Sequence, residues 1–211
     1  MATGKIPYLA IRRFEKWGFR SGLINRMSEN ETNIKVIEAA ARGERKACDA
    51  IVRQFGQTMF GIIARLVADR RDAEELTQDA LLRSIRQIDS YDPMRAPLKS
   101  WLCRIAYRTA LNHLRRPTIE TASIDDLPPT AESDMVDSFM REPDDHRVEL
   151  LQRAIRRLTD DEQLLVTLFY YEEMPLADIA YIIAQTPNAL GVRLHRIRQK
   201  LYNMIKQQDA L

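Results

Sequence analysis

The chain has 211 residues, of which 45% are hydrophobic and 29% charged, an ordinary composition for a protein that forms a hydrophobic core. The formal net charge of +2 hides a segregation of basic and acidic stretches, and only 7 glycines among many Leu, Ile, Ala and Arg residues favour helices over strands. No apolar run approaches the ~18 residues that a membrane-spanning helix needs, so we expect an all-helical protein of the cytoplasm.

The cysteines and histidines give no sign of a metal site or a disulfide. Cys48 and Cys103 lie far apart within helical patterns, which favours free, buried thiols. The histidines, at positions 113, 146 and 195, show no ligand spacing among themselves or with those cysteines. We therefore expect no metal and no cofactor.

Residues 1–28 form a basic N-terminal extension, in which six Lys and Arg residues face a single acid, Glu15. One interpretation is an amphipathic helix that lies on a membrane surface or in a partner's groove, although Gly18 and Gly22 weaken such a helix. The other is a poorly ordered tail, or an extension upstream of a natural start at Met27. It is not a secretory signal, because no uninterrupted apolar core follows the charges.

Residues 33–68 contain two helical patterns separated by a break that Gly43 marks. The second pattern places apolar residues at three- and four-residue intervals, which predicts a core-facing stripe. That stripe comprises Ala47, Ile51, Phe55, Met59, Ile62, Ile63 and Leu66. After a short polar connection, Asp72 is expected to cap the next helix, which is predicted to bury Ala73, Leu76, Ala80, Ile85 and Ile88.

The charge pattern changes sharply across the loop 90–97, which contains Pro93 and Pro97. Before it, the polar face is mostly acidic and amide. After it, from Lys99 to Arg116, there is no acid at all, and Pro117 is a firm stop signal. An acid-free basic helix indicates a polyanionic partner. We expect this helix to bury Trp101, Leu102, Ile105, Ala106 and Leu111.

Residues 118–147 are acidic, contain prolines and lack helical periodicity, so we predict a flexible linker between two domains. Beyond it, Thr159 to Glu162 read as a capping box. A short helix, a tight turn at Ala184 and Gln185, and a last helix capped by Thr186 with Pro187 at its first position form a helix-turn-helix pattern. The last helix has no acid up to Gln207.

These two modules resemble an extracytoplasmic-function sigma factor of bacterial RNA polymerase. The family's polymerase-binding helix is matched by DAEELTQDALLRSIRQI, and its loop and helix that open and hold the promoter −10 element by YDPMRAPLKSWLCRIAYRTALNHLRR. Together these form region 2. Residues 148–206 resemble region 4, whose helix-turn-helix reads the −35 element. The resemblance covers residues 34–116 and 148–206 in the family's order.

The resemblance implies an all-α fold of two small domains, a region 2 bundle over 29–117 and a region 4 helix-turn-helix over 148–211, joined by the linker. It implies binding to core polymerase by Asp72, Glu75, Gln78 and Asp79. The −10 contacts that it implies are Tyr91, Arg95, Lys99, Trp101, Arg104, Arg108, Asn112 and Arg115. The −35 contacts that it implies are Thr186, Asn188, Arg193, His195, Arg196 and Lys200.

Some of these roles have simpler alternatives or depart from the family pattern. Trp101 is either a wedge that stacks on melted bases or a core residue. Arg108 stands where the family usually places an Asn that holds a flipped base. Gly191 stands where a Lys or Arg commonly contacts DNA, and a mid-helix Gly costs about 1 kcal/mol against Ala. The promoter consensus of relatives therefore does not transfer to this chain.

Three classes of function compete for this sequence. A sigma factor would bind core RNA polymerase and promoter DNA, and the family implies an anti-sigma protein as inhibitor. A plain DNA-binding regulator would use only the C-terminal helix-turn-helix and would leave residues 72–116 unexplained. An enzyme is disfavoured, because the sequence has no Gly-rich phosphate loop, metal-ligand set or nucleophile–base pattern.

Overall fold

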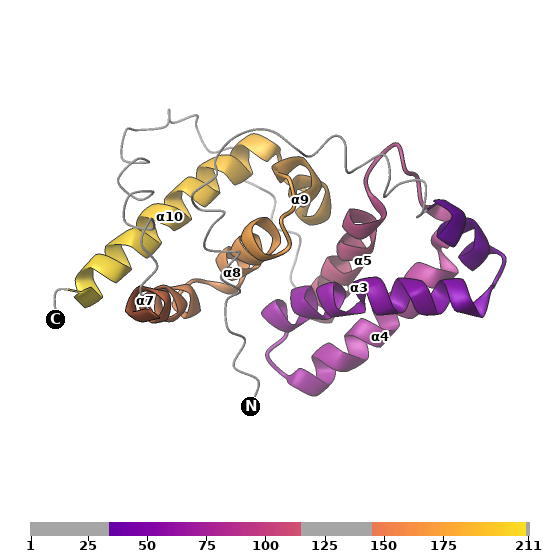
Figure 1. Ribbon diagram of the computed structural model, residues 1–211, viewed down its shortest axis with the longest axis horizontal. Coiled ribbons are helices and arrows are strands. Elements are labelled where there is room, and N and C mark those ends of the chain that lie inside the picture. The colour runs from indigo at the N-terminus through magenta and orange to yellow at the C-terminus, as the bar shows by residue number, and fades with distance from the viewer. Residues whose placement is uncertain (1–33, 115–144, 210–211) are drawn as a thin grey trace. The chain divides into compact units, whose positions relative to one another are not determined.

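The computed structural model describes residues 34–114 and 145–209, and every regular element in those two ranges is a helix (Figure 1). The predicted all-helical fold is thereby confirmed. The chain divides into two compact units. Of the described residues, the first unit holds 34–114 and 177–185, and the second holds 145–176 and 186–209. The N-terminal extension, Arg115, and residues 118–144 of the predicted linker lie outside the described residues.

No helix in the described parts of the chain combines the length and the apolar character that crossing a membrane requires.

The first unit begins with a helix over residues 34–41 that ends in a left-handed turn. Gly43 has φ +79°, and the amide of Glu44 donates to the carbonyl oxygen of Ala39 at 3.0 Å. A second bond, from the amide of Gly43 to the carbonyl oxygen of Ala40, completes a Schellman motif. Glycine suits this turn because it has no Cβ to clash at positive φ.

Helix α3 (Arg45–Leu66) carries the apolar stripe of the first unit. All seven residues of the predicted stripe are buried, so the periodicity of the sequence identified this face correctly. The helix packs against both α4 and α5. These three helices surround one core (Figure 1).

Helix α4 (Arg70–Arg86) begins earlier than predicted. The capping residue is Asp69, whose carboxylate accepts hydrogen bonds from the amides of Arg71 and Asp72 at 2.7 and 3.2 Å. The predicted cap at Asp72 is therefore wrong. Asp72 instead lies in the first turn of the helix, where a carboxylate interacts favourably with the helix dipole.

The buried face of α4 consists of small side chains: Ala73, Thr77, Ala80 and Ser84. The prediction that Leu76 and Ile85 would be buried is wrong, because both are only half-buried. Hydrophobicity alone misplaced the stripe, since the hydroxyls of Thr77 and Ser84 donate to carbonyl oxygens of the same helix and can therefore be buried. Ile88 is buried as predicted, but in the 3₁₀ turn η1 (Ile88–Ser90) after the helix.

Helix α5 (Leu98–His113) is the third helix of this core. Its buried residues are mostly small as well: Leu98, Ser100, Leu102, Cys103, Ala106, Thr109 and Ala110. The predicted burial of Leu102 and Ala106 is confirmed, whereas Trp101, Ile105 and Leu111 are only half-buried. Cys103 is buried and outside any disulfide, as predicted, whereas Cys48 is outside any disulfide but only half-buried.

The second unit contains α7 (Asp145–Arg156), α8 (Asp160–Val166), the π-helical turn η2 (Thr167–Tyr171) and α10 (Pro187–Asp209). The predicted capping box of α8 is confirmed, with the Thr159 hydroxyl accepting from the amide of Glu162 and the Glu162 carboxylate accepting from the amide of Thr159. Buried Leu190, Leu194, Ile197, Leu201 and Ile205 form one stripe along α10. This stripe packs α10 against α7 and α8.

Helix α9 (Leu176–Ile183) precedes α10 by three residues. Ala184 has φ +57°, and the amide of Gln185 donates to the carbonyl oxygen of Ala180 at 3.1 Å. This bond spans the same number of residues as the one that closes the turn at Gly43, but the left-handed position is occupied here by Ala. Thr186 caps α10 as predicted, because its hydroxyl accepts from the amide of Ala189 at 3.2 Å.

Candidate nucleic-acid interface

The outer face of α4 presents the acids that the sequence predicts for polymerase binding. Glu75, Gln78 and Asp79 are exposed. Asp72 is half-buried, and its carboxylate lies 3.7 Å from Nε2 of His113 at the end of α5, an ion pair when the imidazole is protonated. Three of the four predicted residues are therefore open to a partner, and the fourth also links α4 to α5.

The same face continues into an apolar and basic region that the sequence pattern did not reveal. Leu82 is 52% exposed, although it is a large aliphatic residue. It lies in a shallow depression of about 410 Å³ lined by Asp79, Leu82, Arg83, Arg86 and Gln87. The position of Leu82, seven residues after Glu75, was the available signal, since residues seven apart share a helix face.

The loop between α4 and α5 is held in one shape by its own hydrogen bonds. The Asp92 carboxylate accepts from the amide of Met94 at 2.9 Å, and the Asp92 carbonyl oxygen accepts from the amide of Arg95 at 3.1 Å. The Tyr91 hydroxyl donates to the carbonyl oxygen of Ala96 at 3.1 Å, which joins the two ends of the loop. Met94 stands at the tip with 91% of its surface exposed. An apolar side chain so displayed is open to a partner.

An aromatic pair connects this loop to α5. The ring centroids of Tyr91, in the loop, and Trp101, in α5, are 5.6 Å apart in an edge-to-face arrangement with an interplanar angle of 65°. Burial, together with the neighbouring Asp92 carboxylate, raises the pKa of Tyr91 to about 12, so its hydroxyl stays protonated and keeps donating to Ala96. Trp101 is half-buried, so its exposure does not decide between a core residue and a wedge that stacks on melted bases.

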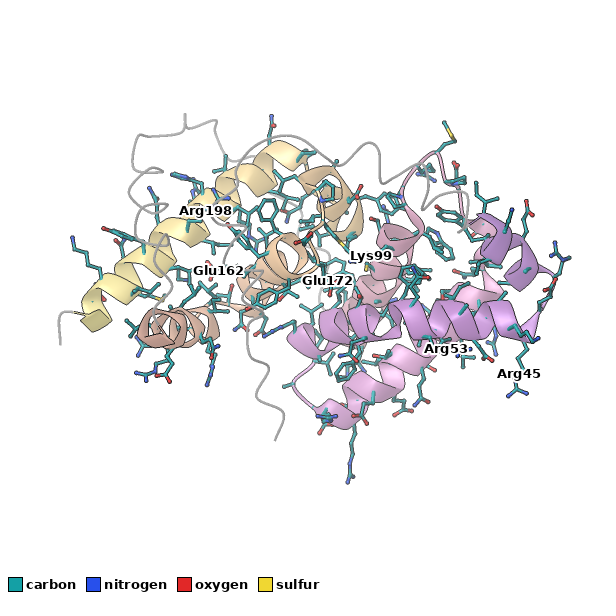
Figure 2. The ribbon with its side chains drawn as sticks, in the orientation of Figure 1. Arg45, Arg53, Lys99, Glu162, Glu172 and Arg198 are labelled. Atoms are coloured by element: carbon teal, nitrogen blue, oxygen red, sulfur yellow. The ribbon has the colours of Figure 1, made fainter. Side chains whose placement is uncertain are left out.

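The remaining −10 candidates lie along α5 and its loop. Arg95, Arg108 and Asn112 are exposed, whereas Lys99 and Arg104 are half-buried. Figure 2 labels Lys99 at the start of α5. Arg115 lies outside the described residues. The exposed members are therefore one residue of the loop, Arg95, and two residues of the second half of α5, Arg108 and Asn112.

The −35 candidates divide into two groups on α10. Thr186, Asn188 and Arg196 are exposed, and His195 is half-buried. Because residues 188, 192, 195 and 196 recur at three- and four-residue intervals, they share a face turned away from the buried stripe. We call this set the outer face of α10.

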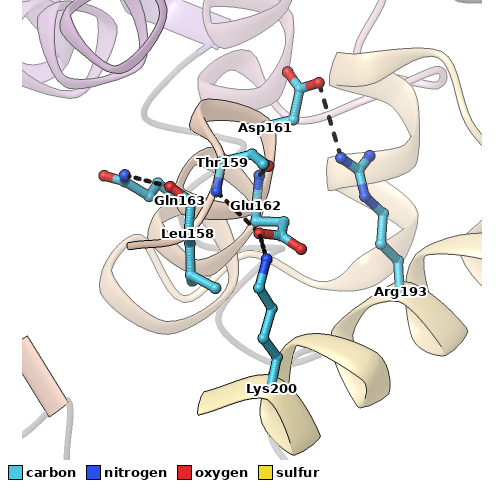
Figure 3. Close-up of polar contacts among 7 residues, drawn as sticks. All are labelled: Leu158, Thr159, Asp161, Glu162, Gln163, Arg193 and Lys200. Carbon is cyan, nitrogen blue, oxygen red and sulfur yellow. Dashed lines mark hydrogen bonds and ion pairs between the residues drawn. The ribbon is translucent and has the colours of Figure 1, made fainter. Parts of the chain in front are cut away.

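The second group points toward other helices of the unit. The Lys200 ammonium lies 2.8 Å from the Glu162 carboxylate, and the Arg193 guanidinium lies 3.9 Å from the Asp161 carboxylate (Figure 3). Arg198, labelled in Figure 2 and not one of the −35 candidates, likewise points inward and donates to the Tyr170 hydroxyl at 2.7 Å. Sequence reasoning missed these acidic partners, although the acids in the first turn of α8 were visible in the capping box.

Within the ranges 34–114 and 145–209, no group of three or more His, Cys, Asp or Glu side chains is arranged to hold a metal ion.

Two family models match the chain, that of sigma-70 region 2 at residues 51–118 and that of sigma-70 region 4 at residues 148–201. The chain is 29% identical over 192 residues to the ECF RNA polymerase sigma-E factor of Haemophilus influenzae, covering 85% of this chain and 98% of that one.

Two solved structures share the fold. The structure of CnrH in complex with the cytosolic domain of CnrY matches with a TM-score of 0.56 at 19% identity, covering 83% of this chain and 97% of that one. The sigma factor RpoE in complex with the anti-sigma factor NepR from Bartonella quintana matches with a TM-score of 0.52 at 19% identity, covering 75% and 96%.

Proposed function

Since the chain belongs to the extracytoplasmic-function sigma factors of the sigma-70 family, we propose that it binds core RNA polymerase and directs it to promoters by contacting their −10 and −35 elements. The main support for this proposal is the arrangement of the first unit, in which an acidic outer face on α4 is followed by a hydrogen-bonded loop and a basic helix. A regulator that only binds DNA has no use for the acidic face.

The outer face of α4 is assigned to core polymerase. Glu75, Gln78 and Asp79 offer carboxylates and an amide to a basic surface, and charge complementarity of this kind steers association. Leu82 adds an apolar contact next to them. Interfaces combine a desolvated apolar contact with surrounding polar groups, and the neighbouring acids and arginines supply the polar part here.

The loop 91–97 and α5 are assigned to the −10 element. Because the loop is held by its own hydrogen bonds, contact with a base extruded from the duplex requires little ordering of the loop. Met94 is the apolar residue at the tip, and Trp101 positions the loop through Tyr91. The remaining −10 candidates are assigned to the phosphates and bases of the opened strands: Arg95, Lys99, Arg104, Arg108, Asn112 and Arg115.

The outer face of α10 is assigned to the −35 element. Asn188, His195 and Arg196 have the hydrogen-bonding groups that read base edges and phosphates in the major groove, and Thr186 holds the start of the helix. Gly191 contributes no side chain, so we expect promoter reading to depend on the residues around it.

An anti-sigma factor is proposed as the regulator, with release in response to stress or another signal. RpoE of Bartonella quintana, which shares the fold, was solved in complex with the anti-sigma factor NepR. The exposed Leu82 and Met94 are apolar surfaces on which such an inhibitor would compete with polymerase and DNA.

Polymerase binding is tested by charge reversal on α4. Glu75→Lys with Asp79→Lys is expected to weaken binding to purified core polymerase at least about tenfold, because two attractive pairs become repulsive. The matched control is Glu38→Lys with Asp49→Lys, which makes the same charge change at exposed sites elsewhere in the unit. Equal binding by the two double variants would remove α4 from the interface, and no binding of the unaltered chain, freed of any inhibitor, would reject the sigma function.

Promoter recognition is tested by mapping transcription start sites after the protein is induced. We expect a set of new starts that share sequence elements near −10 and −35. New starts without shared elements would contradict promoter reading by this chain.

A further inference from the structure

Helix α10 is basic and free of acids up to Gln207, but its cations do not all face the same way. Arg193 and Lys200 are seven residues apart and lie on one flank of the helix, next to the buried stripe. Arg196 lies on the outer face and is exposed. The flank and the outer face are therefore two separate basic surfaces of α10.

The flank is met by the first turn of α8. Lys200 Nζ donates to Glu162 Oε2 at 2.8 Å, and the same carboxylate oxygen accepts the amide of Thr159 at 2.9 Å (Figure 3). Burial by itself raises the pKa of Glu162, but the hydrogen bonds from Lys200 and Thr159 outweigh it and lower the pKa. Glu162 is thus an anion at neutral pH that both caps α8 and neutralises Lys200.

A second acid meets the same flank one residue earlier. Asp161 lies 3.9 Å from the Arg193 guanidinium, a longer and weaker pair, with both side chains about one-third exposed (31% and 33%). Asp160 lies in the same helical turn and is exposed. The three acids therefore differ in what they contact, although they are adjacent in sequence.

We propose that Asp161 and Glu162 determine specificity by acting as internal anions that occupy Arg193 and Lys200, so that these cations do not bind DNA phosphates. The proposal rests on the assignment of α10 to DNA. Contact with DNA then falls on the outer face, through Asn188, His195 and Arg196. Non-specific affinity is held down, because non-specific binding comes from phosphate contacts by Lys and Arg.

The energies allow such a competition. An ion pair between partly exposed side chains stabilises a protein by only ~0.2–1 kcal/mol, so a cation released from its acid is available to a phosphate. Each additional phosphate that the protein neutralises steepens the dependence of log affinity on log salt concentration by ~0.9. The slope of log affinity against log salt concentration therefore reports how many cations of α10 bind DNA phosphates.

The experiment measures binding of the full chain to a fluorescein-labelled duplex of random sequence over a range of salt concentrations. Asp161→Asn and Glu162→Gln are compared with Asp160→Asn, which makes the same charge change in the same helical turn without releasing a cation of α10. Gln at position 162 keeps the capping box, since Gln accepts the same backbone bond. Thermal unfolding of each variant verifies the fold.

Asp161→Asn and Glu162→Gln are each expected to raise non-specific affinity up to about fivefold over Asp160→Asn and to steepen the salt slope by up to ~0.9. Replacing Arg193 or Lys200 by Met in the otherwise unaltered chain is expected to leave the slope unchanged. Arg196→Ala, the matched change on the outer face, is expected to flatten it.

The inference is overturned if both acid variants bind like Asp160→Asn, or if Lys200→Met and Arg193→Met flatten the slope. It is also overturned if neither the unaltered chain nor the variant carrying both acid replacements binds the duplex. None of these results bears on core-polymerase binding by α4, which tests the proposed function separately.

Discussion

Helices α5 and α10 are both basic and nearly free of acids, but they differ in where acids of a neighbouring helix pair with their basic side chains. In the first unit, Asp72 in the first turn of α4 lies against His113, the last residue of α5. In the second, the acidic start of α8 reaches the middle of α10, where Asp161 and Glu162 face Arg193 and Lys200. A basic sequence thus becomes a basic surface only where no neighbouring helix supplies the counter-charge.

The buried faces of the two helices differ as well. α5 buries mostly small residues against the equally small inner face of α4, which allows the helices to approach closely. α10 buries a stripe of five Leu and Ile side chains. We therefore expect the packing of α5 to depend on its two large buried residues, Leu98 and Leu102, and the packing of α10 to depend on a longer apolar stripe.

The largest expected effect comes from removing one large residue from each buried face. Leu102→Ala in α5 and Leu194→Ala in α10 should each lower the free energy of unfolding by about 2–5 kcal/mol, because both side chains are at most 2% exposed. Chemical denaturation of the full chain measures this. Leu82→Ala, at an exposed position, is the control and should change stability by less than about 0.5 kcal/mol. Equal effects at positions 82 and 102 would contradict the burial described for α5.

A smaller effect, of opposite sign, is expected at Thr109 on the buried face of α5. Its hydroxyl is buried without a hydrogen-bond partner, and such a group costs about 1–3 kcal/mol. Thr109→Val keeps the shape and should raise the midpoint of thermal unfolding. Thr77→Val is the control, because the Thr77 hydroxyl donates to the carbonyl oxygen of Ala73 at 2.6 Å and should gain nothing from its removal. A decrease in stability at position 109 would indicate that its hydroxyl is satisfied after all.

Two left-handed helix ends, at Gly43 and at Ala184, offer a third test. Gly43→Ala should destabilise the chain by about 1 kcal/mol, since a Cβ is strained at φ +79°. Ala184→Gly should instead stabilise it by up to about 1 kcal/mol, because Ala184 already bears that strain at φ +57°. Thermal unfolding measures both. The expectation is refuted if both substitutions change stability in the same direction.

The smallest effect concerns pH and the pair between Glu162 and Lys200. Because the folded state lowers the pKa of Glu162, the carboxylate stabilises the fold above its unfolded pKa, and that contribution is lost as pH falls below 4.5 through the folded value. Glu162→Gln should therefore lose less stability between neutral and acidic pH than the unaltered chain. Parallel pH profiles of stability for the two proteins would show that the pair contributes nothing.

Sequence periodicity predicted several features that depend on neighbouring residues in the chain. The buried stripe of α3, the capping box at Thr159, and the start of α10 at Thr186 and Pro187 are all confirmed. Residues three and four apart share a helix face, and a capping side chain bonds to a backbone amide two or three residues away. No knowledge of the tertiary structure is needed for either.

Tertiary structure decided which of the remaining residues are buried, braced or neutralised. Hydropathy favoured Leu76 and Ile85 for the inner face of α4, but close packing placed Thr77 and Ser84 there. Hydropathy also did not predict the hydrogen bonds that hold the loop around Met94, or the exposure of Leu82. These properties depend on helices that are distant in sequence and on hydrogen bonds that form only in one loop geometry.

The sequence by itself determined that the chain is helical, that it has two modules with a region 2 and a region 4 pattern, and where its charges lie along the chain. Those features follow from local periodicity and composition. Only the tertiary structure decided which charges are available to a partner, because an ion pair such as Lys200 with Glu162 joins residues 38 positions apart. The charge of a helix is encoded locally, whereas the charge of a surface is set by whatever packs beside it.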